Sequence, residues 1–343
     1  MIQNSTNKSI IVYFEAGYEK GLGHLYRCRS LAFELSKFKN ISITISTAQK
    51  ELYDIGFKGL KYKWLSPEKI LESYDYDVFI LDISDCPIKL QREIRKRSYF
   101  FVGIDDWGMG PFAYDIVFRP NILKLPSPNM LENDSKVYQG GEFVLLNQGY
   151  SEVIVVDKNK DVAENVFLCF GGSDPSGYTI RVIKILLKMK LTEDIQFSVV
   201  LGPAFTEVDR INALLKDRSN FKIFQNPSNM IELYNSCDTA IISGGGLLYE
   251  SCALAIPSIA LAQEQEQHEE TKLFAKKKAT IRPKDGMYAD DQSIMSSVEE
   301  LLFDATIRSE LITNSQKCVS RSGSKLVAKT IINSYSRKIG KGN

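Results

Sequence analysis

The stretch "SIIVYFEAGYEKGLGHLYRCRSLAFEL", residues 9–35, joins a short apolar run to a glycine-rich turn and an amphipathic segment. The run "SIIVYF" is apolar at nearly every position, which is typical of a parallel strand buried on both faces. Beyond the turn, apolar residues recur at the i, i+3, i+4 spacing of a helix with one buried face: Leu25, Cys28, Leu31, Ala32 and Leu35. The stretch therefore predicts a strand–turn–helix unit, the building block of a doubly wound α/β sheet.

The same alternation continues through the 343 residues. In the first half we expect helices near 24–38, 67–74 and 87–97, and strands at about 41–46, 60–64, 77–82, 99–104 and 115–119. The second half predicts strands at about 166–170, 196–201, 221–224, 239–243 and 257–261. The stretch 127–143 breaks the alternation, and the polar segment 155–165 has the composition of a linker.

This pattern predicts two Rossmann-like domains, 1–158 and 159–343, with a ligand cleft between them. The last predicted helix either stays with the second domain or packs back on the first.

Composition narrows the class of protein. Apolar residues make up 44%, charged residues 25%, and the net charge of +1 gives no reason to expect nucleic acid as a partner. The six cysteines lie far apart without a CxxC pair, as expected of reduced core thiols in a cytoplasmic protein. The longest weakly polar run, residues 251–262, is too short to span a bilayer. We expect no transmembrane segment; peripheral membrane contact and the oligomeric state stay open.

Three glycine-rich turns follow predicted strands and precede predicted helices: "EAGYEKGLGHLYR" (15–27), "FGGSDPSGYT" (170–179) and "ISGGGLLYE" (242–250). Such turns let backbone N–H groups approach a ligand, and the helix behind each favours an anion. A single turn of this kind is as readily structural. Two of them in the second domain indicate a ligand that carries a diphosphate, with Glu250 on the following helix either accepting ribose hydroxyls or exposed to solvent.

His24 is one of only two histidines and stands where the first turn enters its helix. A helix N-terminus disfavours the imidazolium, so the ring is suited to accept a proton, and Arg27 follows one turn later. The alternative is a helix-start residue beside a solvated arginine. The other histidine, His268, lies in a charged segment typical of a surface helix, and neither histidine has the spacing of a zinc site.

Carboxylates follow two further predicted strands, in "LDISD" (81–85) and "GIDDW" (103–107). In α/β proteins, ligands gather at the carboxyl ends of the strands. Asp105 and Asp106 are therefore candidates to bind substrate hydroxyls, and equally candidates to cap the next turn.

The segments "GLGHLYRCRSLAFEL", "LCFGGSDPSGYT" and "ISGGGLLYESCALAIPSIAL", with weaker matches such as "VGIDDWG" and "YDIVFRPNI" between them, resemble in order and spacing the PseG/SpsG-like nucleotide-sugar proteins. These are relatives of the UDP-sugar hydrolase of pseudaminic acid synthesis and, more remotely, of the N-acetylglucosaminyl transferase that makes lipid II. The resemblance covers roughly residues 9 to 280. It implies a GT-B fold with the nucleotide bound by the second domain.

The resemblance also implies site residues. His24 would be the general base, with Glu15 and Asp105 as catalytic contacts. The sugar would be bound by Gly21, Gly23, Arg27, Asp106, Asn121 and Gln267. The nucleotide would be held by Gly171, Gly172, Ser173, Asp174, Gly244, Gly245, Gly246, Leu247 and Glu250. The family's hydrolase releases UDP from a 2,4-diacetamido-2,4,6-trideoxyhexose without a metal or cofactor, so none is expected.

The departures from the family fall in the first domain. An Arg-x-Asp element is replaced by Tyr13-Phe14-Glu15, an Asp-His-Tyr element by Asp82-Ile83-Ser84, and an arginine by Asn147. The nucleotide half of the pattern is retained and the sugar half is altered. The leading hypothesis is therefore an inverting UDP-sugar hydrolase; the alternatives are a GT-B glycosyltransferase and a nucleotide-sugar binder without catalysis.

Overall fold

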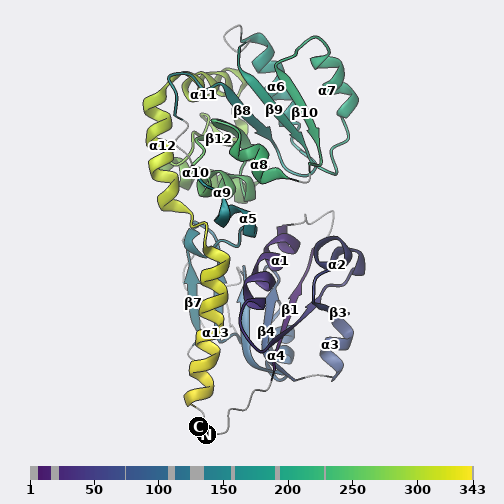
Figure 1. Cartoon of the computed structure of the whole chain (residues 1–343). Coiled ribbons are helices and arrows are strands. Elements are labelled where there is room, and N and C mark those ends of the chain that lie inside the picture. Colours follow the sequence, from purple (N-terminus) through teal and green to yellow (C-terminus); the bar gives the residue numbers. More distant parts are fainter. Residues whose placement is uncertain are drawn as a thin grey trace. The chain divides into compact units, whose positions relative to one another are not determined.

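The computed structural model describes residues 7–16, 23–73, 75–106, 113–123, 135–155, 159–189, 194–227 and 229–341. It divides into two compact units. Unit 1 comprises residues 1–148 and 321–343, and unit 2 comprises residues 149–320. Each unit is an α/β domain with a parallel sheet, which confirms the predicted fold class (Figure 1).

Unit 1 carries a seven-stranded sheet in the order β3-β2-β1-β4-β5-β6-β7, with every neighbouring pair parallel. Its strands are β1 (Lys8–Phe14), β2 (Ile41–Ser46), β3 (Lys63–Leu65), β4 (Tyr76–Asp82), β5 (Ser98–Ile104), β6 (Ile116–Arg119) and β7 (Lys136–Gln139). Its helices are α1 (Gly23–Ser36), α2 (Lys50–Phe57), α3 (Pro67–Ser73), α4 (Ile88–Arg95), the 3-10 turn η1 (Gly141–Phe143) and α13 (Gly323–Lys341).

The continuous apolar run of β1 is explained by its two covered faces. Ile10, Val12 and Phe14 belong to one core cluster together with the predicted apolar face of α1, whereas Ile11 and Tyr13 belong to a second cluster on the other face. Both faces of β1 are covered by apolar side chains, so polar and apolar residues do not alternate along its sequence. The strand and helix predicted from residues 9–35 are thus confirmed.

Unit 2 carries a five-stranded parallel sheet in the order β10-β9-β8-β11-β12. Its strands are β8 (Asn165–Cys169), β9 (Gln196–Leu201), β10 (Phe221–Gln225), β11 (Thr239–Ser243) and β12 (Ser258–Leu261). Its helices are α5 (Gln148–Glu152), α6 (Tyr178–Lys188), α7 (Val208–Leu215), α8 (Met230–Asn235), α9 (Gly246–Ala253), α10 (Gln265–Lys276), η3 (Gly286–Tyr288), α11 (Asp291–Phe303) and α12 (Ala305–Cys318).

The division between the units falls at Gln148, ten residues before the boundary expected from the polar linker. The residues just after it belong to unit 2 because they pack there: the space beside Gly149 is filled by Ile231, and the Tyr150 hydroxyl bonds to Glu250. The expectation did not include α2, β7, η1 or α5. β7 lies in the stretch 127–143. Its four residues are half-buried or exposed, so they do not form the apolar run of a buried strand.

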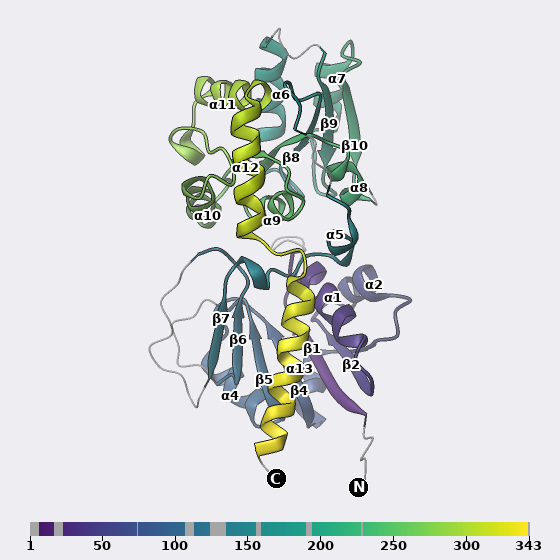
Figure 2. The same ribbon diagram turned by 60° about the vertical axis from the view of Figure 1, so that its left-hand side comes forward.

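Helix α13 returns to unit 1 after the whole of unit 2 (Figures 1 and 2). It lies along α1, and its buried residues join the same core cluster as β1: Val327, Ala328, Ile331, Ile332 and Tyr335. Its last turns are fixed by Tyr335, whose hydroxyl donates to Asp77, and by Lys338, which pairs with Asp115 at 2.6 Å. Unit 1 is therefore closed by a segment about 170 residues distant from its other elements.

This packing predicts that Ile331→Ala destabilises unit 1 selectively. Deleting a fully buried Ile side chain costs about 2–5 kcal/mol. Hydrogen exchange should lose protection in the strands of unit 1 and keep it in β8 and β11. Ile339→Ala on the same helix, where the side chain is 37% exposed, is the matched control and should change protection little. Equal loss in both units would contradict this role of α13.

Candidate active site

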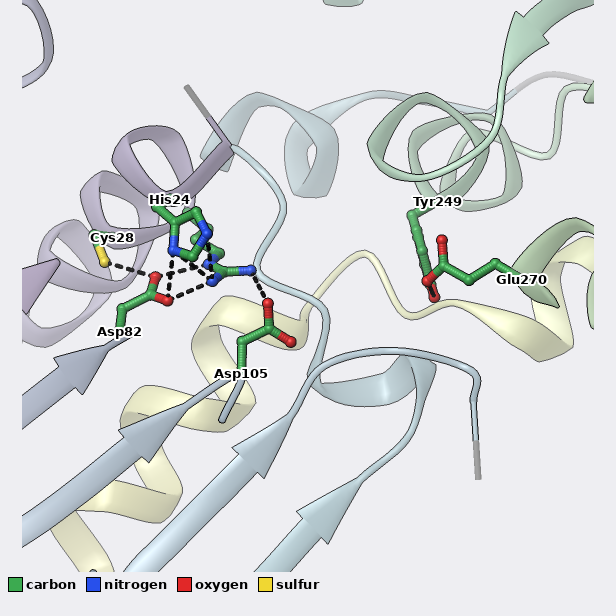
Figure 3. A network of polar contacts seen from close by, with 7 residues as sticks. His24, Cys28, Asp82, Asp105, Tyr249 and Glu270 are labelled. Atoms are coloured by element: carbon green, nitrogen blue, oxygen red, sulfur yellow. Dashed lines mark hydrogen bonds and ion pairs between the residues drawn. The ribbon is translucent and has the colours of Figure 1, made fainter. Parts of the chain in front are cut away.

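The carboxylate of Asp82 is the centre of a polar network at the carboxyl edge of the first sheet. Asp82 is the last residue of β4 and is fully buried. Its Oδ1 lies 2.9 Å from Nδ1 of His24, and its Oδ2 accepts from Nε of Arg27 at 2.7 Å and from the Cys28 thiol at 3.1 Å. Nη2 of Arg27 also donates to Oδ1. Figure 3 shows His24 and Cys28 on α1 directed toward Asp82.

The charges of this network stabilise one another. Burial alone would raise the pKa of Asp82, but the Arg27 guanidinium and the hydrogen bond from His24 outweigh burial and hold that pKa well below its ordinary value. Burial works against the charge of Arg27 as well, and Asp105 and Asp82 together raise the pKa of Arg27 above its ordinary value. Burial, reinforced by the charge of Asp82, raises the pKa of the Cys28 thiol, so this cysteine stays a neutral donor.

Arg27 also ties Asp105 to the network. Its Nη1 donates to Oδ2 of Asp105 at 2.5 Å. Asp105 follows β5 with a positive φ of 57°, a left-handed conformation that aspartate tolerates better than most residues, and its N–H donates to the carbonyl of Phe118 on β6. Its side chain keeps 14% exposure, against 21% for His24 and 18% for Arg27. These three side chains are therefore the solvent-accessible part of the network, and Asp82 is its buried part.

The contact with Asp82 selects one tautomer of His24. Nδ1 lies between Oδ1 of Asp82 at 2.9 Å and Nη2 of Arg27 at 2.8 Å. The carboxylate oxygen can only accept, so its contact with the imidazole requires the proton on Nδ1, and Nη2 of Arg27 then donates to Oδ1 of Asp82. In the opposite tautomer Nδ1 would accept from Nη2 of Arg27 instead, but its lone pair would face the carboxylate oxygen. The arrangement therefore leaves the lone pair on Nε2 of His24, the atom that can take a proton from a substrate or a water.

The other residues expected in unit 1 have differing surroundings. Glu15, directly after β1, is half-buried, and its N–H donates to the carbonyl of Asp82 at 3.4 Å. Gly23 is the first residue of α1 and has open space beside it. Asp106 is fully buried: Oδ2 accepts from the Tyr114 hydroxyl at 2.7 Å.

The carboxylate of Asp106 is therefore held in the interior of unit 1, where Nε2 of Gln91 also donates to it at 3.4 Å. Gly21 lies outside the described residues. Asn121, two residues beyond β6, is 4% exposed.

In unit 2 the two glycine turns follow β8 and β11, which are neighbouring strands. Gly245 has a φ of 70°, which disfavours any side chain there, and Gly246 begins α9 with open space beside it. A Cβ on Gly244 would lie 2.9 Å from Cβ of Gln267, so α10 packs directly on this turn. The structure thus brings Gln267 to the turn that begins at Gly244.

The turn after β8 has a structural carboxylate at its centre. Oδ1 and Oδ2 of Asp174 accept from the backbone N–H groups of Tyr178 and Thr179 at 3.0 and 2.7 Å, capping α6. Burial raises the pKa of Asp174 against these bonds. Gly171, Gly172 and Ser173 lie before this cap, and the carbonyl of Gly172 accepts from the N–H of Ala204. Asp174 therefore shapes the turn, and its oxygens are already occupied by backbone donors.

Glu250 is the most perturbed carboxyl of unit 2. Burial raises its pKa to about 7, and a hydrogen bond with the Tyr150 hydroxyl acts in the opposite direction. The residue lies on the first turns of α9, behind the glycines. A separate buried contact, between the Tyr249 hydroxyl and Oε1 of Glu270 at 2.5 Å, joins α9 to α10 (Figure 3).

Two interactions of the candidate site were not predicted from the sequence. "LDISD" marked Asp82 as a strand-end carboxylate, but its pairing with His24 crosses 58 residues and has no local signal. Tyr150 falls before the expected domain boundary, so its bond to Glu250 was not anticipated.

Among the described residues, no cluster of three His, Cys, Asp or Glu side chains could hold a metal ion, and none of the helices found there is long and apolar enough to cross a membrane. All six cysteines are buried thiols, in agreement with the expected core thiols.

No family model matches the chain. The uncharacterized protein MJ1062 of Methanocaldococcus jannaschii is 32% identical over 332 residues, which cover 90% of this chain and 67% of that protein. The spore coat polysaccharide biosynthesis protein SpsG of Bacillus subtilis is 21% identical over 96% of this chain and 99% of its own length. The UDP-2,4-diacetamido-2,4,6-trideoxy-beta-L-altropyranose hydrolase of Campylobacter jejuni is 20% identical over 75% of this chain and 92% of its own.

Solved structures share the fold at low identity. MurG of Acinetobacter baumannii has a TM-score of 0.65 with 13% identity, covering 95% of this chain and 99% of its own. The UDP-GlcNAc 2-epimerase of Neisseria meningitidis, solved with UDP-GlcNAc, has a TM-score of 0.63 with 13% identity, covering 95% and 100%. These likenesses confirm the GT-B fold.

The raised pKa of Glu250 predicts a pH dependence of stability. The unfolded chain releases this proton near 4.5 and the folded chain near 7, so the stability contributed by the protonated form is complete below pH 4.5 and is lost as pH rises to 7. The full shift corresponds to about 3 kcal/mol. Glu250→Gln should therefore gain stability over the native protein on going from pH 5 to pH 8.

Urea denaturation at several pH values measures this difference. Glu299→Gln, on the exposed part of α11, is the matched control and should follow the native profile. A Glu250→Gln profile parallel to the native one would contradict the raised pKa of Glu250.

Proposed function

The chain belongs to the PseG/SpsG-like family of GT-B proteins, and we propose that it hydrolyses a UDP-activated amino- or deoxy-sugar with inversion. The products are UDP and the free sugar, made for a nonulosonic acid or a surface polysaccharide. The coarser statement, a nucleotide-sugar enzyme of polysaccharide biosynthesis, follows from the family itself. The observation that supports inverting hydrolysis is the contact between Asp82 and Nδ1 of His24, which leaves Nε2 of the imidazole to accept a proton.

In the proposed reaction, Nε2 of His24 takes a proton from a water molecule as the water oxygen forms a bond to the anomeric carbon. The bond from that carbon to the UDP oxygen breaks, and its electron pair leaves with UDP. The positive charge developing on the imidazole is stabilised by Asp82, which accepts from the opposite ring nitrogen. Asp105, held by Arg27, and Glu15 are the further carboxylates suited to bind sugar hydroxyls.

We assign nucleotide binding to unit 2. Its turns after β8 and β11 offer backbone N–H groups and the N-terminus of α9, both suited to a diphosphate that carries negative charge on departure. Glu250 would accept from ribose hydroxyls, and Gln267 would contact the sugar. Structural neighbours described as a MnaA–UDP complex and as an epimerase with UDP-GlcNAc support a UDP-linked ligand.

A glycosyltransferase is the second candidate, because the same base would deprotonate a sugar or lipid-linked hydroxyl in place of water. The observation that favours it lies directly after Asp82. Ile83 is buried and apolar where the hydrolases carry a histidine, and the exposed Ser84 stands in place of a tyrosine. Groups that would fix a water and the sugar are thus replaced. The fold shared with MurG and with the glycotransferase of kitacinnamycin agrees with either reaction.

The base assignment predicts that His24→Ala lowers UDP release by at least about 10²-fold while UDP still binds. A panel of UDP-sugars, with and without candidate acceptors, is assayed for UDP and free sugar. His268→Ala removes the other histidine and should leave turnover unchanged.

Release without an acceptor supports hydrolysis, and release only with one establishes transfer. Tight UDP binding without turnover on the whole panel would instead indicate a binding protein. Normal turnover of His24→Ala would refute the base assignment for every class.

The tautomer argument predicts that Asp82→Asn lowers kcat by at least about 10²-fold with little change in the affinity for UDP, because an amide at this position no longer favours the proton on Nδ1. Steady-state kinetics and calorimetry measure the two quantities. Asp77→Asn, at the opposite end of the same strand β4, is the matched control and should retain kcat. Equal kcat values for both variants would show that Asp82 only stabilises the fold.

A further inference from the structure

The hydroxyl of Tyr150 bonds to a carboxylate whose charge the packing of unit 2 does not require. Tyr150 is 3% exposed and lies on α5, and its hydroxyl bonds to the side chain of Glu250 on α9. Burial raises the pKa of Glu250 to about 7, against the effect of this hydrogen bond. A glutamine would accept from the same hydroxyl without the cost of burying a charge. The carboxylate therefore needs a reason beyond the contact between α5 and α9.

The position of Glu250 supplies that reason. Glu250 lies one helical turn after Gly246, the first residue of α9, and this helix follows the carboxyl end of β11, where parallel sheets bind ligands. Glu250 is half-buried, whereas Tyr150 is almost fully buried. Glu250 therefore keeps some access to solvent, and the hydroxyl that bonds to it comes from the interior of unit 2.

The other titratable groups near this carboxyl stay neutral around physiological pH. Besides Tyr150, the described residues whose charge would interact with Glu250 are Tyr234 on α8 and Cys169 on β8. Burial raises the pKa of both tyrosines well above the ordinary value and raises the pKa of Cys169 to about 12. Between about pH 5.5 and 9, Glu250 is therefore the member of this group that changes its charge.

We propose that Tyr150 is a positioning residue for nucleotide binding: its hydroxyl fixes the Glu250 carboxylate in the orientation in which both oxygens accept from the two hydroxyls of the ribose. A carboxylate has about four lone-pair sites, so one bond from Tyr150 leaves both oxygens able to accept. A glutamate without this anchor would lose more side-chain entropy when the ligand orders it. This inference rests on the proposed function in one respect, that Glu250 binds the ribose.

The proposed contact makes ribose recognition depend on pH. The ionised carboxylate accepts from both ribose hydroxyls, whereas the protonated carboxyl carries a hydrogen on one oxygen and accepts less well. The preference for a ribose should therefore rise as pH increases through about 7, where Glu250 loses its proton. Because the Tyr150 bond lowers the pKa of Glu250, removing that bond should move the midpoint to higher pH.

Calorimetry with UDP and 2′-deoxy-UDP between about pH 5.5 and 9 measures this preference. Both ligands carry the same base and diphosphate, so the ratio of their affinities cancels the titration of the phosphate. The full-length protein should bind UDP about 10-fold or more tightly than 2′-deoxy-UDP at the upper end of the range, and within about 2-fold at the lower end. In Tyr150→Phe the midpoint should rise by about 0.5 pH unit or more, and the preference near pH 7 should fall by about 2-fold or more.

Tyr249→Phe is the matched control. The Tyr249 hydroxyl bonds to the buried carboxylate of Glu270 at 2.5 Å, so this variant removes the same kind of contact from the residue beside Glu250 (Figure 3). Its midpoint and its preference for UDP should match those of the native protein. Glu250→Gln has no carboxyl to titrate at this position, so its preference should be low and independent of pH.

An unchanged midpoint in Tyr150→Phe would overturn the proposal, because a merely structural role would weaken both ligands equally. A pH-dependent preference that persists in Glu250→Gln would also overturn it, and this second variant decides the question if Tyr150→Phe does not fold. Equal affinities for UDP and 2′-deoxy-UDP at every pH would overturn it as well.

The proposed hydrolysis fails separately. A protein that shows the expected profiles but releases no UDP from any UDP-sugar refutes hydrolysis and retains this inference. A protein that hydrolyses a UDP-sugar but does not distinguish UDP from 2′-deoxy-UDP retains hydrolysis and refutes this inference. A protein that binds no UDP compound overturns both.

Discussion

The burial of the Asp82 charge is the constraint on which unit 1 depends. A carboxylate without solvent costs several kcal/mol unless cations and hydrogen-bond donors surround it. Here β4 ends on that carboxylate, and α1 supplies Arg27, His24 and Cys28 around it. Because Arg27 and His24 are three residues apart on one helix, the first turn of α1 is held in a fixed orientation over the strand end. The group that stabilises this junction therefore also orients the imidazole.

In both units the candidate ligand-binding groups lie at the carboxyl ends of parallel strands. In unit 1 the strand order reverses direction between β1 and β4, and the carboxyl ends around that point carry Glu15, Asp82 and Asp105, with Asn121 beyond β6. In unit 2 the corresponding ends carry glycine turns and backbone N–H groups. These are the groups that the proposed hydrolysis assigns to acid–base chemistry in unit 1 and to the diphosphate in unit 2.

Local sequence patterns were sufficient for most of the fold, since buried parallel strands and one-sided helices leave periodic signatures. These patterns did not predict helix α2 or strand β7. The four residues of β7 are too few and too exposed to show a period. The C-terminal helix illustrates a different limit: the helix was expected, but the choice between the two domains depended on packing across the whole chain.

Side-chain roles at the site were predictable only in part. The residue types at strand ends and helix starts singled out His24, Arg27 and Asp105, which the structure brings together, whereas the surroundings of Asp106 and Asp174 depend on nearby donors. Tyr114 and the N–H groups of α6 occupy those two carboxylates. Asp82 and Glu250 acquire their properties from residues 58 and 100 positions away, His24 and Tyr150, which no single-sequence pattern reveals.

The tautomer of His24 is the central claim, and nitrogen-15 NMR of the imidazole tests it most directly. The chain has two histidines, so His268→Gln leaves one set of ring resonances to assign. At pH 8 the account predicts a directly bonded proton on Nδ1 and the chemical shift of an unprotonated nitrogen on Nε2. A proton on Nε2 with a bare Nδ1 would contradict it, because the nitrogen proposed as the base would then have no lone pair to offer.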